Sequence, residues 1–131
     1  MKTLLRNFLL SVILLVLVAC GSSVTVGSFS SLYHDSDDYD SAVQELMTYL
    51  NGLDGCTVKE IGYAGDKVVK KEADSRGKAV EQIIVLTSTF ETGDKKDQNG
   101  LEPNHSYENY TWILTRPTSD AFWEITDHGI E

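Results

Sequence analysis

Residues 83–90 read Ile-Ile-Val-Leu-Thr-Ser-Thr-Phe, and this stretch is the clearest β-strand pattern in the chain. Its first four residues are all apolar, which places apolar side chains on both faces of an extended strand. The Thr-Ser-Thr-Phe continuation keeps the composition that is typical of β-structure. The segment 80–92 is therefore predicted to be a strand at the centre of a sheet.

On the C-terminal side of this strand, the chain alternates between turns and further strands. Residues 93–106 are polar and contain Gly, Asn and Pro, so they are predicted to form a long connection. The predicted strands that follow are 107–116, with Tyr110, Trp112 and Leu114 on one face, and 121–127, with Trp123 and Ile125 on one face, separated by a turn at 117–120.

On the N-terminal side, apolar and aromatic residues recur at helical spacing and predict a helix from about Asp37 to Leu53. The segment 56–63 alternates with period two and is predicted to be the first strand. Residues 65–77 are highly charged and suit either a short exposed helix or an ordered loop. The fold class that buries both apolar patterns is α+β, with one N-terminal helix packed on an antiparallel sheet of about four strands.

The N-terminus has the features of a secretory signal peptide. Lys2 and Arg6 precede an apolar stretch over residues 8–18, which is too short for a membrane-spanning helix. The following Leu17-Val18-Ala19-Cys20 resembles the bacterial lipobox, which implies a diacylglycerol on the sulfur of Cys20 and cleavage of the preceding peptide bond. The alternative is an ordinary secreted protein with a chance cysteine near its cleavage site.

These features predict a bacterial protein that is lipid-anchored at the extracytoplasmic face of the cell membrane. Residues 21–31 are mainly Gly, Ser, Val and Thr, a composition typical of a flexible linker. The predicted organisation is a lipoprotein signal peptide at 1–19, the lipidated cysteine with a flexible tether at 20–32, and a single α+β domain at 33–131.

The charge of the mature chain excludes one class of partner. After loss of the signal peptide, 9 of the 11 basic residues and all 20 acidic residues remain, for a formal charge of −11. A domain this acidic is repelled by polyanions, so nucleic acid is not expected as a partner. Membrane contact is expected through the lipid on Cys20 alone.

The sequence predicts no metal site and no cofactor. The acidic run at residues 35–40 departs from a calcium-binding loop at Tyr39, Asp40 and Leu46, and helix capping explains it better. Cys56 has no partner for a disulfide once Cys20 is acylated, so it is interpreted as a small buried hydrophobe. A nucleophilic thiol is the alternative, and it would need a histidine brought near in space.

Four further patterns resemble a known group of proteins: Gly55-Cys56-Thr57, IIVLTSTF at 83–90, NHSYENYTWILTR at 104–116 and WEITDHG at 123–129. Together with the lipobox, they are similar to small extracytoplasmic lipoproteins of Firmicutes that carry an uncharacterised domain of nuclear-transport-factor-like (cystatin-like) fold. The chain departs from that pattern at Ile130-Glu131, where an aromatic residue would follow the glycine. The resemblance implies a fold, and it implies no catalytic residue.

The expected function is that of a binding or accessory module at the cell envelope, with an envelope protein, a peptide or a glycan as partner. Tyr63, Tyr110 and Arg116 are the predicted contact residues, although sheet packing or an ion pair would explain each of them as well. A small pocket enzyme of the nuclear-transport-factor-like class is one alternative, with Glu124, Asp127 and His128 as candidate acids or bases. A structural subunit of an envelope complex is the other.

Overall fold

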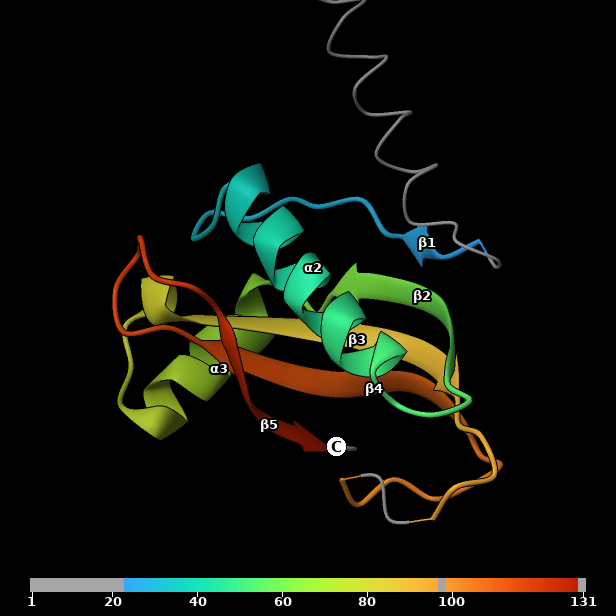
Figure 1. Ribbon diagram of the computed structural model, residues 1–131. Coiled ribbons are helices and arrows are strands. Elements are labelled where there is room, and N and C mark those ends of the chain that lie inside the picture. Colours follow the sequence, from blue (N-terminus) through green and yellow to red (C-terminus); the bar gives the residue numbers. More distant parts are fainter. Residues whose placement is uncertain (1–22, 97–98, 130–131) are drawn as a thin grey trace, which may run out of the picture.

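The computed structural model describes residues 23–96 and 99–129, and within these residues the chain forms an α+β domain with a five-stranded mixed sheet and two α-helices (Figure 1). The strands follow one another across the sheet in the order β1-β2-β3-β4-β5. The elements are β1 Thr25–Val26, α2 Ser36–Asn51, β2 Thr57–Tyr63, α3 Asp66–Arg76, the 3₁₀ turn η1 Val80–Gln82, β3 Ile83–Glu91, β4 Ser106–Thr115 and β5 Glu124–Gly129.

Strand β3 lies at the centre of the sheet, as its sequence predicts. Its Ile84 and Leu86 belong to the core beneath α2, whereas Ile83 and Val85 pack with α3 on the opposite face. All four side chains are fully buried, because a helix covers each face of the sheet. The predicted run of apolar residues thus reflects a strand buried on both sides.

Helix α2 crosses one face of the sheet and places its apolar stripe against it (Figure 1). The helix is capped by Asp35, whose carboxylate accepts a hydrogen bond from the backbone N–H of Asp38 at 2.8 Å. It ends at Gly52, close to the predicted boundary. Its buried residues are Tyr39, Ala42, Val43, Leu46, Met47 and Leu50.

The predicted all-antiparallel sheet of about four strands is wrong in one respect, because β1 adds a parallel fifth strand. Thr25 and Val26 pair with Glu60 and Ile61 of β2. Val24 beside them is only 8% exposed. The Gly and Ser content of residues 24–32 predicts a tether, but Val24, Val26 and Phe29 pack against the core. The packed part of the chain therefore begins before residue 33.

The segment with two open interpretations, 65–77, contains the second helix. Helix α3 buries only Val69 and Ala73, which explains the weak apolar pattern of its sequence. It stops at Gly77, whose positive φ of 64° forms a left-handed cap. The predicted strand at 80–92 begins only at Ile83, because residues 80–82 form the turn η1.

The domain has two ends, between which α2 and the strands run (Figure 1). One, here called the β1 end, contains Val24, the turn at 52–56 and the connection between β3 and β4. The opposite one, here called the Arg116 end, contains residues 31–37, η1 and the loop 116–123. The residues that the structure describes include no helix long and apolar enough to cross a membrane. The predicted signal peptide and Cys20 lie outside those residues.

Candidate functional site

A buried network of charged side chains holds the Arg116 end together. Arg116 Nη1 donates to Oδ1 of Asp38 at 2.9 Å, and Arg116 Nε donates to the carbonyl oxygen of Glu81, also at 2.9 Å. His34 Nε2 donates to the carbonyl oxygen of Ile83 at 2.7 Å, and its Nδ1 lies 3.2 Å from Oδ2 of Asp38. The network therefore joins three segments that are distant in sequence: 34–38, 81–83 and Arg116.

Trp123 closes this network from one side. The guanidinium of Arg116 lies 4.0 Å from the centre of the indole, in cation–π geometry. The indole Nε1 donates to the backbone oxygen of Asp38 at 3.1 Å. The imidazole of His34 meets the indole edge to face, with ring centres 5.6 Å apart. Trp123 thus belongs to the core, and it fixes the loop 116–123 to α2.

The charges around Asp38 control its ionisation. Burial raises the pKa of the Asp38 carboxyl, but the hydrogen bonds and charges of Arg116 and His34 together outweigh that effect. The pKa of Asp38 therefore lies below its ordinary value, and the carboxylate is ionised at neutral pH. Its side chain is 21% exposed, so the pair with Arg116 is shielded from water on most sides.

Two clefts open at this end on either side of the network. They measure about 540 and 320 Å³ and share Asp38, Arg116 and Ser119. Leu32 lies in the wall of the larger cleft and Phe122 in the wall of the smaller one. Leu32 is 93% exposed and Phe122 is 95% exposed, and they are the two most exposed large apolar side chains among the described residues.

The segment beside Leu32 is held to α3 by a second polar cluster. Ser31 Oγ and the hydroxyl of Tyr63 both donate to Oδ1 of Asp66 at 2.5 Å, and the N–H of Leu32 donates to Oδ2 at 2.7 Å. Desolvation raises the pKa of Asp66, but these hydrogen bonds together lower it below its ordinary value. Burial and the neighbouring Asp66 raise the pKa of Tyr63. Tyr63 is therefore a neutral donor that fixes this segment.

A third cleft, of about 550 Å³, lies between α2 and β5. It collects the side chains proposed from the sequence as acids or bases, Glu124, Asp127 and His128, together with Tyr49 of α2. His128 Nδ1 lies 2.7 Å from the hydroxyl of Tyr110, which is itself buried. Asp127 accepts a hydrogen bond from Arg76 at 2.8 Å, and mainly for this reason its pKa is lowered.

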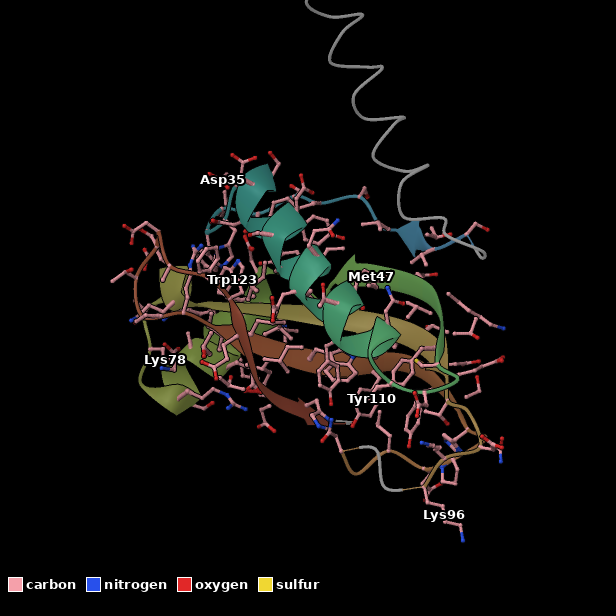
Figure 2. All side chains as sticks on the ribbon, viewed as in Figure 1. Asp35, Met47, Lys78, Lys96, Tyr110 and Trp123 are labelled. Atoms are coloured by element: carbon pink, nitrogen blue, oxygen red, sulfur yellow. The ribbon has the colours of Figure 1, made fainter. Side chains whose placement is uncertain are left out.

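The three predicted contact residues therefore lie in three separate places. Tyr63 is bonded to Asp66 beside the segment that precedes α2. Tyr110 is hydrogen-bonded to His128 of the α2–β5 cleft, and Arg116 belongs to the buried network. Figure 2 shows Tyr110 well apart from Trp123, the residue on which Arg116 stacks. Each has the structural role that the sequence analysis gave as the alternative. Cys20 lies outside the described residues.

Sequence reasoning missed Leu32 and Phe122 as candidate contact residues. Leu32 falls in the segment interpreted as tether, and Phe122 stands one residue before Trp123, where an apolar pair suggests a buried strand. The only signal for Phe122 is the alternation of the strand, in which Trp123 and Ile125 share a face and residue 122 does not.

The structure also decides the role of Cys56. Its side chain is half-buried, and this burial raises the pKa of the thiol to about 11. A thiol with such a pKa is almost entirely protonated at neutral pH and is a poor nucleophile. The interpretation as a small hydrophobe is thus the better one. No group of three His, Cys, Asp or Glu side chains among the described residues is placed to hold a metal ion.

No protein-family model, no curated protein and no solved structure matches this chain.

Proposed function

We infer that the protein is a lipoprotein of the bacterial cell envelope, anchored at the extracytoplasmic face of the membrane through Cys20, and that its domain binds a partner protein. Support for the anchor comes from Lys2 and Arg6, the apolar residues 8–18 and the lipobox ending at Cys20. Two acyl chains give stable membrane attachment, whereas one gives only marginal binding.

The exposure of Leu32 and Phe122 at one end of the domain carries the binding proposal. Burying a large apolar side chain stabilises a complex by about 1.5 to 3 kcal/mol, and interfaces are enriched in aromatic residues. Both side chains stand beside a network in which Asp38, Arg116 and Trp123 are already bonded to one another. The backbone that presents them is thus held in place before a partner arrives, which lowers the entropic cost of binding.

The charges around these two side chains define the partner. Arg116 is the only Lys or Arg among the described residues that line the two clefts, and Asp38 already neutralises it. A basic protein surface with apolar side chains would complement this end in both charge and shape. The carboxylates around the clefts are those of Asp35, Asp37, Asp38, Glu45, Glu81 and Asp120.

The nuclear-transport-factor-like, or cystatin-like, fold remains part of this proposal. It is supported by a helix that crosses one face of the antiparallel strands β2 to β5. The enzyme alternative would use the α2–β5 cleft, where an acid active at neutral pH needs a raised pKa. Asp127 in that cleft has a lowered pKa, because Arg76 donates a hydrogen bond to it, so it is a poor candidate for such an acid.

A cross-linking experiment in living cells tests both parts of the proposal. A photoreactive amino acid is placed at position 32, at position 122 or, as control, at Val68, which is 36% exposed on α3. We expect one basic extracytoplasmic protein to be captured from positions 32 and 122 and not from position 68. Cys20→Ala should abolish incorporation of labelled fatty acid, and label retained in that variant would contradict the anchor.

A matched pair of charge reversals tests the chemistry of the partner. Asp37→Lys lies in the wall of the smaller cleft and should reduce the captured adduct several-fold, whereas the exposed Glu108→Lys on β4 should leave it unchanged. Equal yields from positions 122 and 68, or an adduct insensitive to Asp37→Lys, would overturn the binding proposal. Capture of a neighbouring copy of this chain would instead favour a structural subunit.

A further inference from the structure

Residues 24–32 are part of the folded domain. Val24 is buried in the core that α2 covers, and the Thr25–Val26 strand pairs with β2. The N–H of Gly27 extends this pairing by donating to the carbonyl oxygen of Ile61 at 2.8 Å. The hydroxyl of Tyr39 on α2 donates to the carbonyl oxygen of Gly27 at 3.0 Å. The segment is thus bound to both the sheet and the helix.

The rest of the segment, up to the start of α2, also makes specific contacts with the domain. The ring of Phe29 stacks on Tyr39, with centres 4.5 Å apart and planes 9° from parallel. Ser31 and Leu32 are bonded to Asp66 of α3. Contacts of three kinds, strand pairing, ring stacking and hydrogen bonding to a carboxylate, therefore follow one another along residues 24–32.

This attachment limits the distance between the lipid and the domain. The chain from Cys20 to Val24 spans four residues, which reach about 14 Å when fully extended. A free chain from Cys20 to residue 33, as predicted from composition, would reach about 45 Å. With the shorter connection, the lipid anchor must stay near the β1 end, where Val24 enters the fold.

We propose that the β1 end of the anchored domain rests against the lipid headgroups, and that the Arg116 end points away from the membrane. This inference rests on the proposed acylation of Cys20. Helix α2 runs from the Arg116 end towards the β1 end, and its 16 residues span about 24 Å. Leu32 and Phe122 are consequently held about that far from the headgroups, within reach of a partner in the envelope.

Energy transfer to labelled lipids measures this orientation. The mature lipoprotein, purified from membranes in a Cys56→Ala background, is placed in vesicles of phosphatidylcholine and phosphatidylglycerol that carry an acceptor dye in the headgroup. A donor dye is attached to Lys96→Cys at the β1 end or to Lys78→Cys at the other end. Both lysines are exposed, and Figure 2 shows them at opposite ends of the domain. We expect several-fold greater transfer from position 96 than from position 78.

A flexible insert identifies the cause of any difference. About 12 Gly and Ser residues inserted before Ser23 would lengthen the connection without touching Val24, and should bring the two transfer values close together. Equal transfer from positions 96 and 78 without the insert, in a protein that floats with the vesicles, would overturn the orientation and leave the anchor intact. Failure to float, with no lipid on Cys20, would overturn the proposed function and this inference together.

Discussion

The two ends of the domain are built by different means. At the Arg116 end, a buried ion pair and a stacked indole connect segments that lie far apart in sequence. At the β1 end, the chain crosses itself at Gly55 and Gly93, where a Cβ atom on Gly93 would lie 2.7 Å from the carbonyl oxygen of Asp54. The ion pair of Lys95 with Asp54 at this end is exposed. Buried polar side chains thus connect the segments of one end, whereas the backbone comes into close contact with itself at the other.

This difference bears on what each end can do. An end held by buried side chains can present Leu32 and Phe122 without relying on them for stability, because neither is needed for its packing. An end held by close backbone contact has little room for substitution at Gly93, but its outward side chains are free to face lipid headgroups.

Removal of the buried cation should destabilise the Arg116 end most. Arg116→Met leaves the carboxylate of Asp38 without its main partner and the carbonyl of Glu81 without a donor, so we expect a loss of about 3 kcal/mol in the free energy of unfolding. Lys59→Met, which breaks the exposed pair with Glu91 at the other end, should cost less than about 1 kcal/mol. Urea denaturation of both variants measures this, and equal losses would remove the distinction between the two ends.

Addition of one methyl group should destabilise the β1 end. In Gly93→Ala, the new Cβ meets backbone atoms of Asp54 and Gly55 that no side-chain rotation can move, for an expected loss of about 2 kcal/mol. Gly129→Ala is the matched control, because no atom of the described residues, apart from its chain neighbours, lies within 4 Å of the new Cβ, and the variant should change stability little. Thermal unfolding of the two variants compares them, and a neutral Gly93→Ala would show that this crossing is not close-packed.

The pH dependence of stability should report on the same network. The pKa of Asp38 in the folded protein lies below its value of about 3.9 in the unfolded chain. The carboxylate therefore contributes fully to the free energy of unfolding above that value, and this contribution is lost as the pH falls through the folded pKa. Asp38→Asn should therefore lower stability at neutral pH and make the decline below about pH 4 shallower. Asp66 and Asp127 also have lowered pKa values and leave a residual slope. The free energy of unfolding is measured against pH for the wild type and for Asp38→Asn, and parallel curves would contradict this role of Asp38.

Much of the fold could be predicted from local patterns. The central strand β3, the helix α2 and the strands β2 and β4 follow from apolar residues at spacings of two or of three to four. Strand β5 begins three residues later than the predicted strand 121–127, because Trp123 packs from the preceding loop onto α2. Helix α3 could not be assigned from the sequence because it buries only two side chains. Strand β1 could not be predicted because a strand of two residues is too short to show a periodic pattern. The candidate site was predicted least well. Arg116 was identified, but as a contact residue and not as the support for Leu32 and Phe122.

Local sequence patterns established the α+β class, the order of the main elements and the acidic character, and they predict a lipobox, because each depends on residues close together in the chain. The packing of residues 24–32 on the domain, and the contact of Asp38 with Arg116, 78 residues away, became evident only in three dimensions. Contacts over such separations form only when the sheet brings its strands and helices together. A linear pattern of residue types carries no record of those distances.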